Sequence, residues 1–316
     1  MNSKERNPIV TVTLNPALDQ TVYIAEFQMG QVNRVAEQRV DPGGKGINVA
    51  KVIRALGHSV CVTGFLGQDN SHGFYEYFRK QQIDNYFVEV EGAARVNIKI
   101  VDGQSNQVTE INFPGLTCNA ADLRELEHVI GGLAQEQQWF VLSGSLPQGV
   151  SEDIYRQLIT RLQQQGARVF LDSSGSALRE GIKATPYAIK PNLEELSQLV
   201  GRSLAEEIEI RSAVEDLLAG GIQQVIVSLG ARGAIVAQKN EFIMARPPAV
   251  VAKSTVGAGD AMVAGFVAGQ TEGLSLQDCA RLGTAAATAS VIQPGTQAGS
   301  VQQVAEILPR VQISKW

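Results

Sequence analysis

Residues 255–268 read Thr-Val-Gly-Ala-Gly-Asp-Ala-Met-Val-Ala-Gly-Phe-Val-Ala, and this stretch predicts a buried helix that begins at two glycines and a carboxylate. From Ala261 onward the segment is apolar on every face, which is typical of a helix in a protein interior. The first N–H groups of a helix have no partner inside it, and together with the helix dipole they attract anions. The glycines let a ligand approach this backbone closely, and Asp260 can meet a hydroxyl. The stretch therefore favours a phosphoryl-transfer site.

A simpler interpretation of residues 255–260 is purely structural. The two glycines can serve only to make a tight turn, and Asp260 can serve only to cap the helix. Other parts of the sequence have to decide between the two interpretations.

Composition limits the classes of protein to consider. With 316 residues, of which 44% are hydrophobic and 19% charged, the chain can bury one large α/β core or two smaller ones. A net charge of -5 without long lysine or arginine runs argues against nucleic acid or an anionic membrane as a partner. No apolar run reaches the length of a membrane span, and the polar start Met-Asn-Ser-Lys-Glu-Arg lacks a signal-peptide core. We therefore expect a cytoplasmic protein that binds small ligands.

The sequence gives little support for a disulfide framework, a metal site or a serine hydrolase. Cys61, Cys118 and Cys279 are far apart and odd in number, so neither a disulfide framework nor a Cys-x-x-Cys metal site is expected. The histidines have no metal-ligand spacing, and no Gly-x-Ser-x-Gly motif marks a hydrolase nucleophile.

Short runs rich in valine and isoleucine alternate with helix-length amphipathic segments, which is typical of a parallel sheet covered by helices on both faces. The predicted strands are 9–14, 60–65, 139–142, 169–172, 187–190 and 225–229. The predicted helices are 46–56, 71–81, 121–133, 152–165, 193–200, 207–219, 258–269 and 276–291. The sequence thus predicts an α/β fold.

Two stretches interrupt this alternation and predict pairs of antiparallel strands. Residues 21–27 and 32–40 are joined by Gln-Met-Gly-Gln, and residues 95–101 and 107–113 are joined around Asp102-Gly103. Polar and apolar side chains alternate along 95–101, as expected of a sheet that covers a site with one face and packs or dimerises with the other. We expect a β lid formed by about 20–41 and 92–115 on a single catalytic domain spanning 1–316. An ordinary extension at the edge of the main sheet is the alternative.

Ligands bind where the strands of an open α/β sheet end, so the residues that follow each predicted strand matter most. These stretches are polar and rich in glycine, and they comprise 143–147, 172–175, 190–192 and 228–233. A second loop, Asp41-Pro-Gly-Gly-Lys-Gly46, opens another helix and adds the charge of Lys45. It is not a Walker A loop, because Gly46 stands after the lysine, where that motif requires Ser or Thr. Neither glycine cluster fits the dinucleotide pattern Gly-x-Gly-x-x-Gly.

Six motifs in order resemble the ribokinase-like (PfkB) sugar kinase superfamily, in the subgroup that phosphorylates sugar phosphates. They are Asn15-Pro-Ala-Leu-Asp19, Gly43-Gly-Lys-Gly-Ile-Asn48, Ser143-Gly-Ser-Leu-Pro147, Lys190-Pro-Asn-x-x-Glu195, Ser228-Leu-Gly230 and Thr255–Asp260. The resemblance extends over nearly the whole length of the chain. Residues 65–70 and 109–115 are most similar to the bacterial members that phosphorylate fructose 1-phosphate. The resemblance implies a three-layer sandwich with a central, mostly parallel sheet and a small β lid.

The resemblance implies ATP-dependent phosphorylation of fructose 1-phosphate to fructose 1,6-bisphosphate. Asp260 would accept the proton of the attacking hydroxyl, and Gly257, Ala258 and Gly259 would form the anion hole for the transferring group. A raised pKa of Asp260 is not required, because alignment and charge neutralisation dominate phosphoryl transfer.

The same resemblance assigns the acceptor site. The residues that would contact sugar hydroxyls are Asp19, Gly43, Gly44 and Asn48. Arg95 would read the substrate phosphate, which suits a guanidinium fork. Lys45 is a second phosphate candidate, and Arg34 is a third from its position in the first strand pair, where a solvated strand face is the alternative.

For the donor, the resemblance implies ATP along the helix 276–291 and the following nucleotide-binding residues: Lys190, Asn192, Ser228, Gly230 and Gly233. Asn192 and Glu195 match a motif that helps hold Mg²⁺ through water, without direct ligation. A homodimer formed through the β lid is also expected.

Several alternatives remain open at this stage. Within the family, the substrate could be tagatose 6-phosphate or fructose 6-phosphate; Lys45 argues mainly against the latter. A non-catalytic regulator that binds sugar phosphates is a different class of function, which an intact Asp260 disfavours. Nucleotide preference, allosteric control and any need for a monovalent cation are not encoded in a recognisable pattern.

Overall fold

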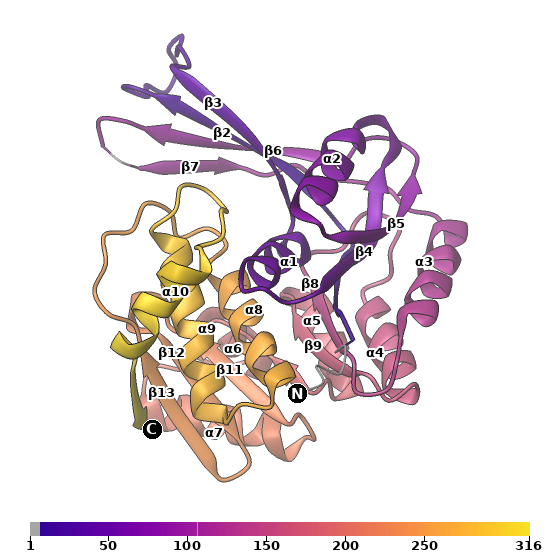
Figure 1. The fold of residues 1–316 in the computed structure, drawn as a ribbon, viewed down its shortest axis with the longest axis vertical. Helices are drawn as coiled ribbons and strands as arrows, with labels where there is room; N and C mark the ends of the chain where they lie inside the picture. Colours follow the sequence, from indigo (N-terminus) through magenta and orange to yellow (C-terminus); the bar gives the residue numbers. More distant parts are fainter. Residues whose placement is uncertain (1–6, 106) are drawn as a thin grey trace.

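A computed structural model of the chain describes residues 7–105 and 107–316. Its main body is a sheet with helices on both faces, and a second, smaller sheet projects from one end of that body (Figure 1). This arrangement confirms the predicted α/β class and the layered architecture.

The main sheet has ten strands in the order β14-β13-β12-β11-β10-β9-β8-β1-β4-β5. Their bounds are β1 Ile9–Thr13, β4 Val60–Gly67, β5 Asp84–Val90, β8 Trp139–Ser143, β9 Arg168–Asp172, β10 Ala188–Ile189, β11 Gln224–Ser228, β12 Ala234–Gln238, β13 Glu241–Arg246 and β14 Gln312–Lys315. The strands from β5 to β11 in this order pair in parallel, whereas β11 to β14 pair antiparallel. The carboxyl ends of the parallel strands therefore meet at one edge of the sheet.

Two helical layers cover this sheet. The helices are α1 Lys45–Ala55, α2 His72–Gln81, α3 Ala120–Leu133, α4 Ile154–Gln164, α5 Gly175–Gly181, α6 Leu193–Val200, α7 Glu207–Ala219, α8 Ala258–Glu272, α9 Leu276–Val291 and α10 Val301–Ile307. Residues of α1, α2 and α8 to α10 share one apolar core with one face of the sheet, and residues of α3 to α7 share another with the opposite face. Alternate side chains of each strand enter opposite cores, as the period of a strand requires.

The helix that contains residues 258–268 is buried on all sides, as its sequence predicts. It packs closely against α9, because Gly265 lets the two backbones approach. A Cβ built on Gly265 would lie 2.8 Å from the carbonyl oxygen of Leu282. The close packing fixes the direction of α8 and hence the place where its N-terminus points.

The second sheet has the order β3-β2-β6-β7, with bounds β2 Ala17–Ile24, β3 Glu37–Gly43, β6 Arg95–Asp102 and β7 Val108–Ile111. Both predicted antiparallel pairs are present, and β2 joins them by pairing in parallel with β6. The predicted bounds of the first pair were wrong: residues 25–36 form a long connection instead of the four-residue Gln-Met-Gly-Gln turn. This connection is held by its own contacts, since the Asn33 side chain bonds the backbone of Gln28 twice, at 2.9 and 2.8 Å.

The other predicted elements agree with the structure to within a few residues, except that the strand predicted at 187–190 is shortened to β10. The sequence analysis missed β5, β12, β13, β14, α5 and α10. The hairpin of β12 and β13 turns at Lys239-Asn240, where Asn240 adopts the left-handed φ of 65° that asparagine tolerates better than most residues.

Candidate active site

The N-terminus of α8 forms the centre of the site. Gly257 precedes the helix with φ 80°, a backbone conformation that side chains other than glycine rarely adopt. Asp260 lies in the first turn and is only 6% exposed. Its Oδ2 accepts a hydrogen bond of 3.0 Å from Nδ2 of Asn48, a residue of α1. The structure thus joins the two glycine loops of the sequence, because α1 and α8 start at the same place.

Burial raises the pKa of Asp260 to about 6, against the opposing charge of Lys45. Asp172 adds to the increase by repulsion, while the bond from Asn48 opposes it. Phosphoryl transfer does not require such a shift, but a carboxylate with this pKa is a better proton acceptor near neutral pH than an exposed one. It is still largely ionised above pH 7.

Asp172, at the end of β9, holds two lysines next to Asp260. Its Oδ1 is 3.2 Å from Nζ of Lys45 and 3.3 Å from Nζ of Lys190. Burial alone would raise the pKa of Asp172, but Lys190 and Lys45 together outweigh burial and hold that pKa below its usual value. Lys190 also lies against the anion loop, because a Cβ built on Gly259 would be 3.2 Å from its Nζ. Sequence analysis noted Asp172 only as a polar strand end and assigned it no role.

Asp19 forms a second cluster beneath the smaller sheet. Asn97 donates to its Oδ1 at 3.2 Å, and Lys99 lies 3.2 Å from its Oδ2. Gly43 is close, since a Cβ there would approach Asp19 Oδ2 to 2.6 Å. The parallel pairing of β2 with β6 sets this geometry by aligning Asp19 with Asn97. The alternation along 95–101 marked Asn97 and Lys99 as the polar face, but sequence analysis did not name them as site residues.

The three predicted phosphate-reading cations lie in different surroundings. Arg95 opens β6 and donates from Nη1 to the carbonyl of Phe113 at 2.9 Å, while its buried Nε has no hydrogen-bond partner. Burial lowers the pKa of Arg95, against the attraction of Asp19. Lys45 instead belongs to the Asp172 cluster. Arg34 lies on the 25–36 connection, so the strand position that suggested it was wrong.

A cavity of about 620 Å³ lies beside the N-terminus of α8. Residues from the predicted nucleotide site line it: Asn192, Ser228, Gly230 and Gly233. Small side chains of α9, namely Thr284, Ala287 and Thr288, form one wall, and Ala258 and Gly259 close the inner end. Apolar walls of this kind with few polar groups suit a flat base, and the anion loop at one end suits phosphates.

Asn192 and Glu195 cap α6 reciprocally. The Asn192 side chain accepts from the Glu195 N–H at 2.8 Å, and a Glu195 carboxylate oxygen accepts from the Asn192 N–H at 2.8 Å. This arrangement orients Glu195 and leaves its second carboxylate oxygen without a bond among those found in the described chain. Within residues 7–105 and 107–316, no three His, Cys, Asp or Glu side chains are grouped so that they could hold a metal directly.

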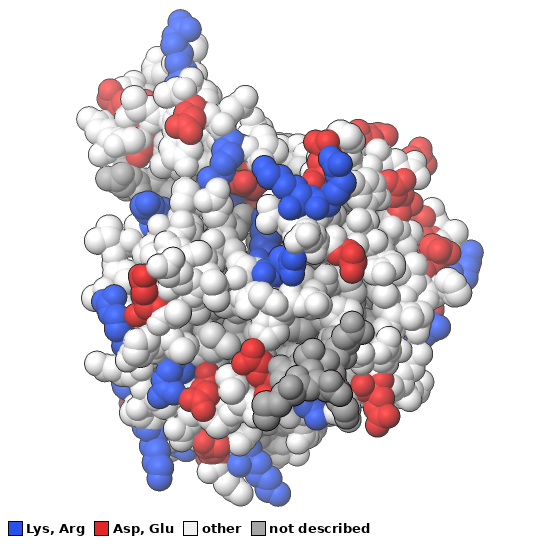
Figure 2. All heavy atoms as spheres, in the orientation of Figure 1, with Lys and Arg blue, Asp and Glu red and all other residues white. Residues whose placement is uncertain are grey.

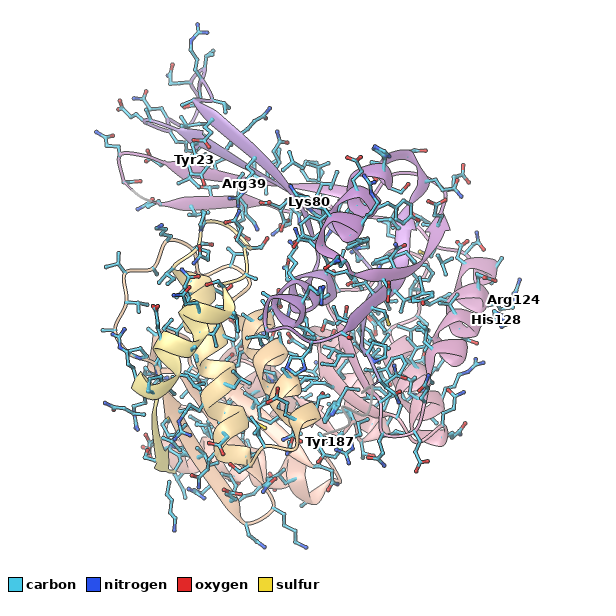
Figure 3. All side chains as sticks on the ribbon, viewed as in Figure 1. Tyr23, Arg39, Lys80, Arg124, His128 and Tyr187 are labelled. Carbon is cyan, nitrogen blue, oxygen red and sulfur yellow. The ribbon has the colours of Figure 1, made fainter. Side chains whose placement is uncertain are left out.

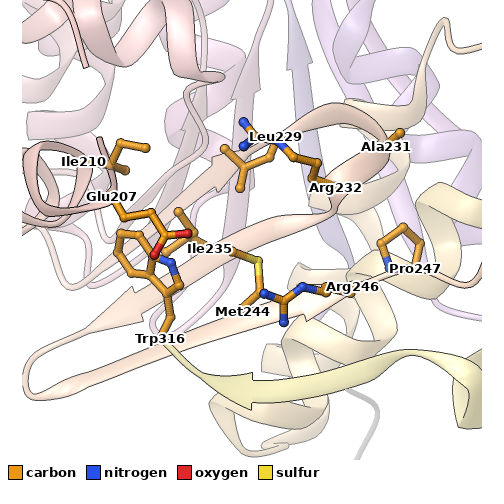
Figure 4. A pocket seen from close by; sticks show the side chains of 10 residues that line it. All are labelled: Glu207, Ile210, Leu229, Ala231, Arg232, Ile235, Met244, Arg246, Pro247 and Trp316. Atoms are coloured by element: carbon orange, nitrogen blue, oxygen red, sulfur yellow. The ribbon is translucent and has the colours of Figure 1, made fainter. Parts of the chain in front are cut away.

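A smaller cavity of about 280 Å³ lies next to the 620 Å³ cavity and shares Ala231 and Pro247 with it. Figure 4 shows that side chains of α7, β12 and β13 enclose it together with Trp316. None of the predicted site residues lines this cavity.

The sequence and the fold were compared with those of known proteins. Residues 12–303 match the model of the pfkB family carbohydrate kinases. The 1-phosphofructokinase of Vibrio cholerae is 39% identical, with 97% of this chain and 96% of that protein aligned. The 1-phosphofructokinase of Rhodobacter capsulatus is 45% identical over 88% of each chain. The phosphofructokinase-2 of Escherichia coli in complex with fructose-6-phosphate has a similar structure, with a TM-score of 0.91 and 31% identity, over 96% of this chain and 98% of that chain.

Proposed function

The chain belongs to the pfkB family of carbohydrate kinases, and we propose that it transfers the γ-phosphoryl group of ATP to fructose 1-phosphate and forms fructose 1,6-bisphosphate. Two relatives that align over most of their length bear the name 1-phosphofructokinase, which supports this substrate.

One observation carries the proposal on the structural side. A buried carboxylate with a raised pKa lies in the first turn of a helix whose N-terminus opens at a left-handed glycine. On one side is the 620 Å³ cavity, and on the other is the Asp19 cluster. A proton acceptor and an anion hole between two binding regions are what in-line phosphoryl transfer needs.

In the reaction, Asp260 accepts the proton of the attacking hydroxyl as the oxygen bonds to the γ-phosphorus and the bond to the β-phosphate oxygen breaks. Asn48 holds the carboxylate in place. The N–H groups of Gly257, Ala258 and Gly259 stabilise the charge on the transferring group. For Ala258 this requires its N–H to leave the Thr255 carbonyl oxygen, to which it donates at 3.3 Å. Lys45 is close enough to Asp260 to affect its pKa, so its ammonium adds positive charge at the reacting end of the acceptor.

The acceptor sugar lies between Asp260 and the second sheet. The residues that contact its hydroxyls are Asp19, Gly43, Gly44 and Asn48. The Asp19 carboxylate accepts hydrogen bonds, the Asn48 amide donates and accepts them, and the glycines leave backbone groups accessible. Arg95 binds the phosphate that the substrate already carries, and its unpartnered Nε supports this role. Lys45 and Arg95 belong to separate clusters, which supports the proposal that they bind opposite ends of the sugar.

The nucleotide occupies the cavity bounded by β11, α8 and α9. Ser228, Gly230 and Gly233 line this cavity and would lie near the base and ribose, whereas Asn192 would lie toward the phosphates. Lys190 does not line the cavity, but it lies against Gly259 at the cavity's anion loop. The distance of 3.2 Å between Lys190 Nζ and a Cβ built on Gly259 supports a contact with the transferring group.

Two carboxylates outside the lining of this cavity, Glu195 and Asp172, are the candidates to hold Mg²⁺ near the phosphates. Glu195 would hold it through water with the oxygen that its helix cap leaves free, and the buried Oδ2 of Asp172 has no hydrogen-bond partner. Magnesium keeps several waters and needs few protein ligands, which agrees with so sparse a donor set. When bound, the ion neutralises charge on the β- and γ-phosphates.

We further propose that 1–316 is one catalytic unit whose second sheet serves as a lid and as a dimer contact. The polar face of this sheet, with Asp19 and Lys99, is buried toward the body, while its outer face bears the half-exposed Val40, Val96 and Ile111. Apolar exposure on a sheet is typical of an interface between copies. In the described chain no helix is long and apolar enough to cross a membrane. The proposed substrates make the cytoplasm the expected compartment.

Fructose 6-phosphate is the second candidate acceptor. A structure in complex with this sugar shares the fold at 31% identity, which supports it. By resemblance, Lys45 in the Gly43-Gly-Lys-Gly46 motif argues against a 6-phosphofructokinase and so favours the first assignment. A non-catalytic regulator would have no use for a buried base with a raised pKa.

The test is steady-state kinetics with ATP and Mg²⁺ against fructose 1-phosphate, fructose 6-phosphate, tagatose 6-phosphate and fructose. We expect the highest kcat/KM with fructose 1-phosphate and almost none with fructose, because loss of the phosphate leaves Arg95 without its partner. If another sugar phosphate were preferred by more than about tenfold, a difference of roughly 1.4 kcal/mol in transition-state binding, the substrate assignment would be wrong. Absence of turnover with all four would favour the regulator.

A further inference from the structure

A second large cleft, of about 780 Å³, takes no part in the proposed reaction. It lies between the C-terminal parts of α1 and α2 and the segment 293–303, which leads into α10. None of the residues assigned to either substrate lines it. Its volume falls within the range of sites for small molecules, roughly 300 to 1,000 Å³. Figure 2 shows lysine and arginine side chains gathered over this part of the surface, and Figure 3 labels Lys80 and Arg39 there.

The charges of the cleft are unbalanced. Lys51 and Arg54 enter it from α1, and Lys80 enters it from α2. Among the described residues that line the cleft, Asp41 is the only acidic one. Its Oδ2 already accepts from Nε of Arg39 at 2.7 Å, so Asp41 brings a positive neighbour with it. A concave surface with such an excess of positive charge attracts anions.

Several donors in the cleft have incomplete partners. Lys51 is only 7% exposed, yet its ammonium bonds the Pro42 carbonyl and the Asn48 side chain and has no bonded carboxylate among the described residues. Burial lowers its pKa to about 8. Lys80 forms no hydrogen bond or ion pair within the described parts of the chain. The Oγ1 of Thr296, a residue that is only 6% exposed, also lacks a partner there. A phosphate supplies the acceptors that such groups need.

The cleft is connected to the reacting groups by two short routes. Lys51 Nζ donates to Asn48 Oδ1 at 3.3 Å, and Asn48 Nδ2 donates to Asp260 Oδ2 at 3.0 Å. Thr296 lies against the anion loop, since a Cβ built on Gly257 would be 3.7 Å from it. An anion that draws the Lys51 ammonium toward itself weakens the bond that orients Asn48.

We propose that the cleft between α1, α2 and residues 293–303 binds a small phosphate-bearing anion other than the two reactants, and that its binding acts on Asp260 through Lys51 and Asn48. The site is regulatory and separate from both substrate regions. The binding half of the proposal does not depend on which sugar is the acceptor.

Binding is tested with inorganic phosphate at constant ionic strength, by calorimetry and by the shift in melting temperature of the whole chain. We expect saturable binding that weakens at least tenfold in Lys80→Ala and recovers to within a few-fold in Lys80→Arg. Arg79→Ala is the matched control, because Arg79 is next to Lys80 but does not line the cleft and pairs with Glu76. Arg95→Ala should retain this binding. Absence of saturable binding, or equal binding in wild type and Lys80→Ala, would overturn the site, and loss in Arg95→Ala would then place the phosphate at the substrate region.

Coupling is tested by measuring kcat at saturating substrates while phosphate is added. We expect kcat to fall at least twofold in wild type and Arg79→Ala, and to stay constant in Lys80→Ala, whose activity without phosphate is normal. If phosphate binds as described but kcat is unchanged, the route through Lys51 is wrong. If no sugar phosphate is turned over, the proposed function fails, while the calorimetric result for the cleft still stands.

Discussion

At the scale of single residues, Asp260 determines the chemistry, because its carboxylate is buried yet must be ionised to accept a proton. Asp260→Asn should lower kcat by about two to four orders of magnitude and change both KM values little, since the base acts in the transition state. In wild type, kcat/KM should fall as the pH drops through about 6, where Asp260 becomes protonated. A pH–rate profile measures both effects. Near-normal turnover of the variant would contradict the assignment.

Asp260→Asn should lower activity but raise the stability of the folded protein at neutral and alkaline pH. The folded pKa of Asp260 is raised above its unfolded value, so its contribution to wild-type stability is greatest below pH 4 and is lost as the pH rises through about 6. Asp260→Asn has no such charge and should melt at a higher temperature than wild type at pH 8, with a smaller difference at pH 4. Thermal unfolding at the two pH values checks this. A variant that melts lower at pH 8 would mean that the carboxylate is stabilised by its lysine neighbours.

Arg95 is the second residue with a separable role. Arg95→Ala should raise the KM for the sugar phosphate about tenfold or more and leave the KM for ATP nearly unchanged, because a lost charge-assisted contact costs roughly 1.5 to 3 kcal/mol. Arg95→Lys keeps the charge but loses the fork and should lie between the two. Equal increases in both KM values would show that the bond of Arg95 to Phe113 is its only function.

At the scale of elements, α8 has a left-handed glycine at each end, which separates backbone strain from catalysis. Gly257 has φ 80° at the N-terminus, and Gly273 has φ 75° at the C-terminus. Alanine at either position should lower the free energy of unfolding by about 1 kcal/mol, since the left-handed conformation disfavours a Cβ. A Cβ fits sterically at both, with only an ordinary contact to Thr296 at Gly257.

The kinetic consequences of the two substitutions should differ. Gly257→Ala should lower kcat at least tenfold, because the anion loop changes its direction, whereas Gly273→Ala should leave kcat as in wild type. Denaturant unfolding and steady-state kinetics on both variants provide the comparison. A loss of kcat in Gly273→Ala as large as in Gly257→Ala would mean that helix stability, not loop geometry, limits the reaction.

At the scale of the whole molecule, the outer face of the second sheet should hold two copies together. Ile98 lies on that face, because it pairs with Ile111 of β7 and Gln20 of β2. Ile98→Lys should convert a dimer into a monomer in sedimentation experiments, because it places a charge in an apolar contact. Ile208→Lys is the control, since Ile208 is 66% exposed on α7, far from this sheet in the fold. A wild-type chain that remains monomeric at every concentration would contradict the dimer.

The sequence by itself determined the elements and the motifs that belong to one contiguous segment. The helix at 258–268 is apolar on all sides, and the loops around Gly43 and Gly257 carry their own backbone requirements, so local physics suffices to recognise them. Most strands rich in valine and isoleucine were found for the same reason, although the buried β12 was not. The short or exposed strands, such as β14, were missed because little apolar surface marks them.

Only the tertiary structure decided which of these segments meet. Asn48 bonds Asp260 across 212 residues of sequence, and Asp172 gathers Lys45 and Lys190 from two separate loops. The pairing of β2 with β6 put Asn97 and Lys99 on Asp19, which no local pattern could specify. The raised pKa of Asp260 likewise depends on burial and on charges far away in sequence. Desolvation and Coulomb interactions depend on distance in space, and the fold alone sets those distances.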